Sequence, residues 1–294
     1  MLFASIDIGS NAARLLLAHV FDSTLEPSSA SHVAFVRVPL RLGEDVFHCG
    51  MISEPRIINL IKTLKAFQLL IDVYAPTDFV ICATAAMREA SNRGEILDLV
   101  KKETGLTIRI IDGQEEAAII QGANNLFSKF RDETLMYVDV GGGSTEISIL
   151  HDNNFVTSRS FNAGTIRMLQ NKVEKEHWNE MLQWVEQSTV PFSSITCVGS
   201  GGNINKLVKL YGDKITSRIT FKEINEGYCK LNKMSVDERM VKLQMRFDRA
   251  DVIVPAAKIF SSIMSAAKID FVLAPKLGLV DGLIYELSQK TRDQ

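Results

Sequence analysis

The segment that spans residues 7–14 combines an acid, a glycine turn and basic, hydroxyl and amide side chains in a pattern that could hold a phosphate group. It follows an apolar, strand-like run, and its glycine allows a tight hairpin. The N–H groups of such a turn can converge on a phosphate oxygen, and an arginine can bind phosphate through two hydrogen bonds. An ordinary hairpin explains the pattern equally well. The residues expected to form this phosphate site are Asp7, Gly9, Ser10, Asn11 and Arg14.

The segment 139–146 repeats this pattern with three consecutive glycines between apolar runs. Glycines weaken a strand pair, so they are expected where the backbone must approach a ligand closely. Asp139 and Glu146 flank the turn and are expected to hold Mg²⁺, a hard cation that prefers carboxylates, water and phosphate oxygens. A flexible hairpin is the alternative, which the presence of both segments makes less favoured. The expected phosphate contacts here are Gly141, Gly142, Gly143, Ser144 and Thr145.

A third glycine segment, 199–202, follows a buried strand and opens a helix. Free N–H groups at a helix N-terminus bind anions, so Gly199, Gly201 and Gly202 are further candidates for phosphate contact. A tight strand–helix turn is the other interpretation. Ile204 stands where the dinucleotide fingerprint GxGxxG requires its third glycine, which excludes that kind of site.

Two acids and one arginine are candidates for catalysis. Glu115 and Glu116 lie in the first turn of an expected helix, where acids are favourable whatever their function. Hydrolysis of an anhydride needs a base that orients and deprotonates water. Glu116 is the candidate, although the residues alone do not distinguish it from Glu115. Arg88, in a helix expected to follow Thr84, either neutralises phosphoryl charge or pairs with a surface acid.

The elements that must position these residues form a weak internal repeat: a strand, an acid, a glycine turn and two further strands. Strands are expected at 2–8, 14–20 and 32–40, and again at 135–140, 146–150 and 155–161, with helices at 85–103 and 115–127 among others. This predicts an α/β protein of two halves, 1–122 and 123–294, with the ligand in the crevice between them.

Composition narrows the class of protein. The chain has 294 residues, 46% of them hydrophobic and 23% charged, with a net charge of −2, as in an average globular protein of two domains. No global positive field would attract nucleic acid, so no nucleic-acid partner is expected. The four scattered cysteines indicate neither disulfides nor a zinc site. No apolar run approaches the ~20 residues that span a membrane, and we expect a cytoplasmic protein without membrane contact.

Taken together, these segments resemble the exopolyphosphatase/guanosine pentaphosphate phosphatase family of the actin-like superfamily. The resemblance runs in order along nearly the whole chain, through residues 6–11, 83–92, 113–117, 139–146, 164–167, 198–203 and 249–255. It implies two actin-like (ribonuclease H-like) lobes, each a mixed sheet flanked by helices, with an interlobe cleft. It also implies catalytic roles for Glu116 and Arg88, and Mg²⁺-associated positions for Asp139 and Glu146.

By this resemblance we expect a Mg²⁺-dependent phosphohydrolase that releases terminal phosphate by water attack, and a homodimer. The substrate would be short-chain polyphosphate or guanosine pentaphosphate (pppGpp). Ala12 departs from the family pattern, which has Ser or Thr there, and the turn 278–282 lacks an arginine that members often carry. The alternatives are a non-catalytic regulator that binds (p)ppGpp or another nucleotide, and an ATP-using kinase of the same fold.

Overall fold

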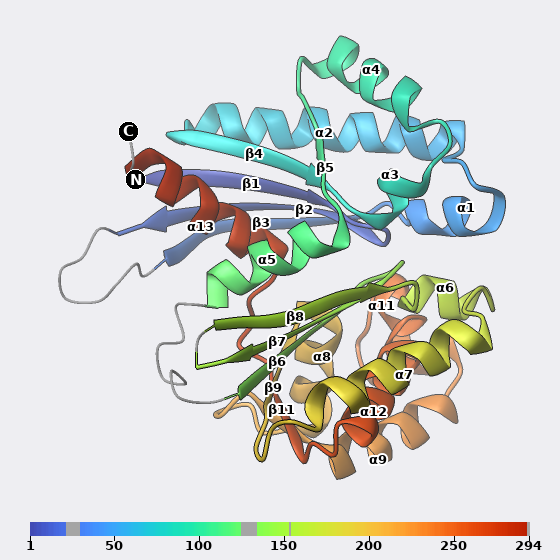
Figure 1. Ribbon diagram of the computed structural model, residues 1–294. Coiled ribbons are helices and arrows are strands. Elements are labelled where there is room, and N and C mark those ends of the chain that lie inside the picture. Colours follow the sequence, from blue (N-terminus) through green and yellow to red (C-terminus); the bar gives the residue numbers. More distant parts are fainter. Residues whose placement is uncertain (22–29, 125–133, 153, 293–294) are drawn as a thin grey trace. The chain divides into compact units, whose positions relative to one another are not determined.

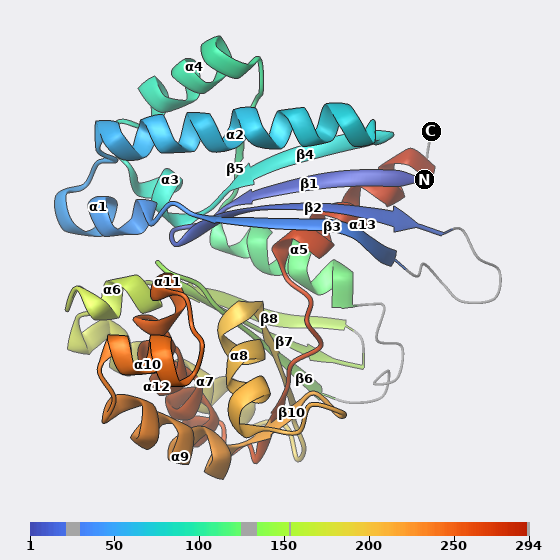
Figure 2. The same ribbon diagram turned by 180° about the vertical axis from the view of Figure 1, so that it is seen from behind.

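The computed structural model describes residues 1–21, 30–124, 134–152 and 154–292, shown from two sides in Figures 1 and 2. The chain forms two compact units. Unit 1 comprises Met1–Ser128 and Leu277–Gln294, and unit 2 comprises Lys129–Lys276.

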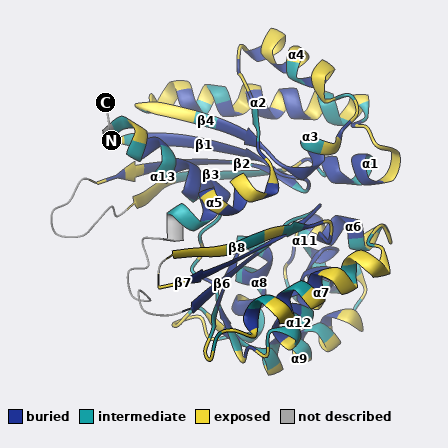
Figure 3. Ribbon diagram, in the orientation of Figure 1, coloured by how far each residue is buried: buried dark blue, intermediate teal, exposed yellow. Residues whose placement is uncertain are grey.

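Unit 1 is built on a five-stranded mixed sheet of order β3-β2-β1-β4-β5. The strands are β1 (Leu2–Ile8), β2 (Ala12–Val20), β3 (Ala30–Pro39), β4 (Asp78–Ala83) and β5 (Arg109–Ile110). The first three form an antiparallel meander, and β4 and β5 continue the sheet in parallel with β1. The central strand β1 is buried along nearly its whole length (Figure 3), as expected of a strand covered on both faces.

Helices cover both faces of this sheet. Figures 1 and 2 show α2 on one face and α13 on the other. The helices of unit 1 are α1 (Leu42–Cys49), α2 (Glu54–Tyr74), α3 (Ala85–Glu89), α4 (Arg93–Thr104), α5 (Gly113–Asn124) and α13 (Leu279–Arg292).

The single helix predicted over 85–103 is wrong, because the chain breaks into α3 and α4. Ala90 has an extended backbone, with φ −63° and ψ 125°. The N–H of Ser91 donates to the carbonyl of Gly50, and the Asn92 side chain exchanges two hydrogen bonds with the backbone of Ile52. These tertiary bonds satisfy the polar groups that a continuous helix would have satisfied internally.

Unit 2 repeats the arrangement in a six-stranded sheet of order β10-β11-β9-β6-β7-β8. Again an antiparallel meander is followed by parallel strands, and one antiparallel strand ends the sheet. The strands are β6 (Thr134–Val140), β7 (Thr145–His151), β8 (Asn154–Phe161), β9 (Thr196–Ser200), β10 (Arg218–Thr220) and β11 (Phe271–Leu273). The helices are α6 (Thr165–Leu169), α7 (Lys175–Thr189), α8 (Gly201–Tyr211), α9 (Phe221–Asn232), α10 (Val236–Lys242), α11 (Phe247–Ala250) and α12 (Ile253–Ala266).

The two units do not follow the predicted division into 1–122 and 123–294. The first boundary lies near residue 128, and the last helix, α13, belongs to unit 1. Val280 and Ile284 of α13 pack with Phe3 and Leu16, and Ser5 Oγ donates to the carbonyl of Val280 at 2.8 Å. This apolar face of β1 and β2 needs a cover, which a segment far along the chain supplies. The predicted end of the helix 115–127 lies beyond Asn124, outside the described residues.

The predicted fold class is confirmed: an α/β chain with two lobes, each a mixed sheet flanked by helices. Among the described helices, none combines the length and the apolar character that crossing a bilayer requires.

Candidate active site

In unit 1, the first glycine turn joins β1 to β2 and rests on the start of α1. Gly9 N donates to the carbonyl of Ala12 at 3.1 Å, which closes the turn. The carbonyls of Ser10 and Asn11 accept hydrogen bonds from the N–H groups of Gly43 (2.9 Å) and Arg41 (3.0 Å). Carbonyl oxygens and phosphate oxygens are both acceptors and repel each other. Because the carbonyls of this turn already accept bonds from the backbone, the turn is better suited to a phosphate.

Asp7 and Arg14 form an ion pair across this hairpin. They are Cα partners on β1 and β2, and Arg14 Nη1 donates to Asp7 Oδ2. Asp7 is 2% exposed, and its Oδ1 is buried without a hydrogen-bond partner among the described residues. Burial raises the pKa of Asp7, while the nearby Arg14 and Arg37 oppose that shift. An ionised carboxylate and a phosphate are both acceptors, so the geometry favours an indirect role for Asp7, as the anchor of the Arg14 guanidinium.

In unit 2, the second glycine turn joins β6 to β7 and rests on the start of α6. Its carbonyls at Gly141 and Gly142 accept from the N–H groups of Thr165 (3.0 Å) and Ile166 (2.8 Å). Arg167 Nε donates to the third carbonyl, of Gly143, at 2.7 Å. The glycines of this turn were expected to let the backbone come close to a ligand. They also let it come close to the start of α6.

Two predicted contact residues, Thr145 and Gly199, have structural roles in unit 2, as does the neighbouring Gly164. A Cβ on Gly164 would lie 2.4 Å from backbone atoms of Gly142 and Gly143. Thr145 is fully buried, and its hydroxyl donates to the carbonyl of Ala163 at 2.6 Å. A Cβ on Gly199 would lie 2.9 Å from the Val272 side chain in the core. A buried hydrogen bond therefore accounts for Thr145 and core packing for Gly199, and contact of either residue with phosphate stays a prediction.

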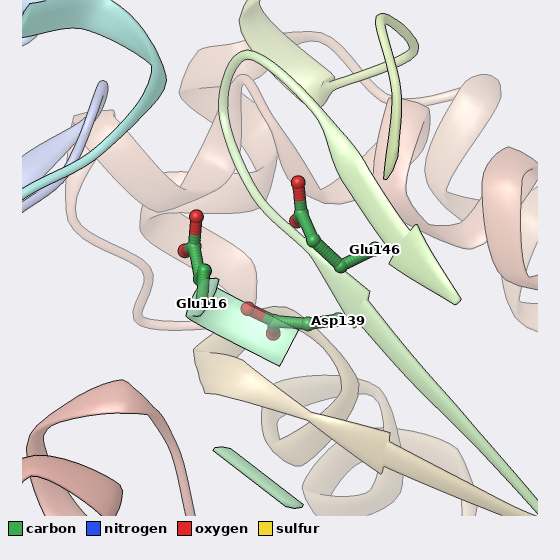
Figure 4. A group of neighbouring side chains, drawn as sticks. All are labelled: Glu116, Asp139 and Glu146. Carbon is green, nitrogen blue, oxygen red and sulfur yellow. The ribbon is translucent and has the colours of Figure 1, made fainter. Parts of the chain in front are cut away.

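Asp139 and Glu146 face each other on neighbouring strands of unit 2. They are Cα partners on β6 and β7, and one carboxylate oxygen of each lies within 4.8 Å of the other. Ser200 Oγ donates to Asp139 Oδ1, and Ser160 Oγ donates to Glu146 Oε1 at 2.8 Å. Figure 4 labels this pair together with Glu116 of α5. Like charges directly opposite each other are destabilising, and two carboxylates suit a hard divalent cation such as Mg²⁺.

The third glycine segment lies beside Asp139, where β9 ends and α8 begins. Gly201 has a φ of +86°, which favours glycine, and a Cβ there would lie 3.1 Å from Asp139 Oδ1. A Cβ on Gly202 would lie 2.5 Å from Arg249 Nη2. The absence of a side chain at residue 202 therefore admits the Arg249 guanidinium next to the first turn of α8.

Arg249 received no role from the sequence beyond its place in a family segment. Its Nη1 donates to Asn203 Oδ1 in the first turn of α8. The signal that could have found it is its occurrence in the segment 249–255, which the resemblance includes.

In unit 1, the structure distinguishes the two acids at the start of α5. Asp112 Oδ1 accepts from the N–H groups of Gln114 (2.9 Å) and Glu115 (2.8 Å), which fixes where the helix begins. The side chain of Glu115 is 43% exposed and pairs with Arg109 at 3.0 Å. Glu116 is only 8% exposed. A buried acid is the better candidate for a base, because burial tunes its proton affinity.

The side chain of Arg88 forms a hydrogen bond with the backbone of unit 1. Its Nη1 donates to the carbonyl of Ile111 at 2.8 Å, immediately before the residues that begin α5. This bond links α3 to the strand end from which α5 starts. A contact between Arg88 and a phosphoryl group stays a prediction.

Comparison with known proteins agrees with these features. The model of the Ppx/GppA phosphatase family matches residues 26–291. The chain is 29% identical over 308 residues to a bifunctional 3-dehydroquinate synthase/phosphatase of Fusobacterium nucleatum, covering 96% of this chain but only 46% of that relative. It is 22% identical to exopolyphosphatase 1 of Mycobacterium tuberculosis, covering 95% of this chain and 86% of that protein.

Solved structures with similar folds cover nearly the whole chain. The Ppx/GppA family member of Aquifex aeolicus is 26% identical with a TM-score of 0.78, covering 99% of this chain and 98% of that one. An exopolyphosphatase from Cytophaga hutchinsonii has a TM-score of 0.85 with the same coverage and 21% identity, which shows the shared fold alone. The match of the family model to most of the sequence shows that the chain belongs to the Ppx/GppA phosphatase family, a family of hydrolases.

Proposed function

We propose that this protein is a phosphohydrolase that removes the terminal phosphate of a polyphosphate chain. The observation that carries the proposal is the carboxylate pair Asp139–Glu146 beside the glycine turn of unit 2. A pair of acids next to a turn that suits phosphate is the arrangement expected where a divalent cation and a phosphate are held together. Polyphosphate is the proposed substrate class because relatives that match this chain along most of its length are named exopolyphosphatases.

In the proposed reaction, Glu116 orients a water molecule and accepts its proton. The water oxygen bonds to the terminal phosphorus while the anhydride P–O bond on the opposite side breaks. Inorganic phosphate and a chain shortened by one phosphate leave. Asp139 and Glu146 would hold Mg²⁺, which when bound supplies charge neutralisation for the phosphate oxygens.

Arginines complete the proposed charge balance. Arg14 is held in place by Asp7, and Arg249 lies at the start of α8. Both guanidiniums suit phosphate geometry. Because Glu116 belongs to unit 1 and the carboxylate pair to unit 2, the proposal requires residues of both units to act on one substrate. A cytoplasmic location, a homodimer and activity on pppGpp stay predictions.

The test is release of inorganic phosphate from short polyphosphate, long polyphosphate, pppGpp and ATP, each with Mg²⁺ and with a chelator. The decisive variant is Glu116→Gln, and the matched control is Glu115→Gln, one residue away. We expect Glu116→Gln to lower turnover by about 10²–10⁴-fold. Glu115→Gln should stay within about fivefold of wild type, because its amide oxygen can still accept a hydrogen bond from Arg109 and the exposed ion pair contributes at most about 1 kcal/mol.

Each alternative predicts a different result. Near-wild-type turnover in Glu116→Gln contradicts the assignment of the base. Tight binding of a nucleotide without hydrolysis of any substrate indicates the regulator. Consumption of ATP that depends on an added acceptor indicates the kinase.

A further inference from the structure

The C-terminal helix α13 contacts α5 with almost no side chain between them. A Cβ on Gly282 would lie 2.2 Å from the carbonyl oxygen of Ile119 and 2.7 Å from its carbonyl carbon. Leu279 and Leu283 of α13 pack around this point with Ile119 and Ile120 of α5. The crossing is therefore fixed by backbone contact, and any larger residue at position 282 must separate the two helices.

Arg109 ties both helices to the sheet. Its Nη1 and Nη2 donate to the two carboxylate oxygens of Glu286 on α13, at 3.0 and 3.1 Å. Its Nη2 also lies 3.0 Å from Glu115 Oε1 on α5. The arginine comes from β5, so one guanidinium joins three elements. Bidentate arginine–carboxylate pairs restrict geometry more than single ion pairs do.

These contacts flank the proposed base in sequence. Arg109 holds Glu115, the residue before Glu116, and Gly282 meets Ile119, one turn further along α5. A helix held at both places cannot rotate or slide without breaking one contact. A displacement of about 1 Å of a reacting group can cost about 10²-fold in rate, so the position of this turn has a functional consequence.

We propose that Arg109 and Gly282 are positioning residues: through them α13, bonded by Glu286, fixes the turn of α5 that carries Glu116 and so places the general base. This inference rests on the proposed function.

The first experiment compares kcat and KM for polyphosphate in Arg109→Met, Glu286→Gln and the exchanged pair Arg109→Glu/Glu286→Arg. Lys290→Met is the matched control, because Lys290 also bonds to Glu286, at 2.7 Å, but from the same helix. We expect Arg109→Met to lower kcat by about 10–100-fold with KM nearly unchanged. The exchanged pair restores the bond to residue 286 but places an acid opposite Glu115, so it should recover only part of that loss, and the control should match wild type.

The second experiment measures hydrogen exchange of the amides at residues 115–120, which does not depend on activity. We expect faster exchange at these amides in Arg109→Met and in Gly282→Ala, with unchanged exchange in α7. Unchanged exchange at α5, or a folded Arg109→Met enzyme with the kcat of wild type, overturns the inference. Absence of hydrolysis by the wild-type protein overturns the proposed function alone. The exchange experiment still tests whether Arg109 and Gly282 hold α5 in place.

Discussion

The two units use the same hairpin but place different pairs of side chains on it. In unit 1, Asp7 faces Arg14, and in unit 2, at the same spacing in sequence, Asp139 faces Glu146. Both turns close with a similar backbone bond, and both rest on a following helix through a glycine, Gly43 or Gly164.

Because of this difference, the same hairpin suits ligands of opposite charge in the two units. An ion pair balances its own charge, whereas two acids directly opposite each other destabilise the sheet unless a cation relieves them. The hairpin of unit 1 therefore suits an anion held by Arg14, and the hairpin of unit 2 suits a cation. A single position, arginine in one repeat and glutamate in the other, distinguishes the two.

The strongest way to break the comparison is to remove one acid of unit 2. Glu146→Gln should lower turnover by about 10²–10³-fold, the usual cost of losing one group that stabilises transition-state charge. The apparent affinity for Mg²⁺, measured from the cation dependence of turnover, should fall as well. Folding stability without Mg²⁺ should be equal to or above that of wild type, since one of two like charges is removed. Unchanged Mg²⁺ dependence would show that the pair does not hold the cation.

The corresponding change in unit 1 should affect folding stability as well as chemistry. Arg14→Met leaves the buried Asp7 carboxylate without its ion-pair partner and should lower the free energy of unfolding by about 3 kcal/mol. The double variant Asp7→Asn/Arg14→Met should recover most of that loss. Urea unfolding followed by circular dichroism measures both. A loss below about 1 kcal/mol would mean that solvent replaces the arginine.

Alanine at the two supporting glycines sharpens the comparison further. In Gly164→Ala the new Cβ meets backbone at 2.4 Å, whereas in Gly43→Ala the nearest atoms belong to the side chains of Phe47 and Ser10. Side chains can move and backbone cannot, so Gly164→Ala should cost about 1–3 kcal/mol and Gly43→Ala less. Equal costs in urea unfolding would mean that the turn of unit 2 yields as easily as a side chain.

The smallest expected effects concern the ion pairs of α13, the helix that completes unit 1. The hydrogen bond from Arg109 lowers the pKa of Glu286. The resulting contribution to folding stability is present above pH 4.5 and is lost as the pH falls through the pKa of Glu286 in the folded protein. Bonding to Asp281 raises the pKa of His32, so this second contribution is present below pH 6.5 and is lost as the pH rises through the folded value.

Spectroscopy can separate the two units in this experiment. Both tryptophans, Trp178 and Trp184, lie in α7 of unit 2. We expect the thermal midpoint by circular dichroism to fall slightly at both ends of the pH range, while tryptophan fluorescence follows a flatter profile. His32→Gln should remove the slope at higher pH, and Glu286→Gln the slope at lower pH. Identical profiles by both probes would contradict a separate role for α13.

Local patterns predicted much of this molecule. Apolar runs that end on an acid and a glycine located both hairpins, because a strand and a tight turn depend on neighbouring residues. The choice of Glu116 over Glu115 as the candidate base depends on tertiary contacts: Glu115 pairs with Arg109, and Glu116 is buried. The spacing of residues in the sequence does not reveal these contacts.

Other features depend on contacts between distant segments, which no local pattern reveals. The break at Ala90 arises from bonds to Gly50 and Ile52. The glycines at 142 and 143, which were predicted to lie close to a ligand, also lie in close backbone contact with Gly164. The return of α13 depends on an exposed apolar face of β1 and β2 that only the folded sheet creates.

That return makes unit 1 a discontinuous domain into which all of unit 2 is inserted. During synthesis, which proceeds from the N-terminus, unit 2 has its whole sequence available before α13 has been made. The face of β1 and β2 that includes Phe3 and Leu16 must wait uncovered until then. Such exposed apolar surface is what chaperones bind and what aggregates. The nascent chain should therefore be most vulnerable in the interval between completion of unit 2 and emergence of α13 from the ribosome.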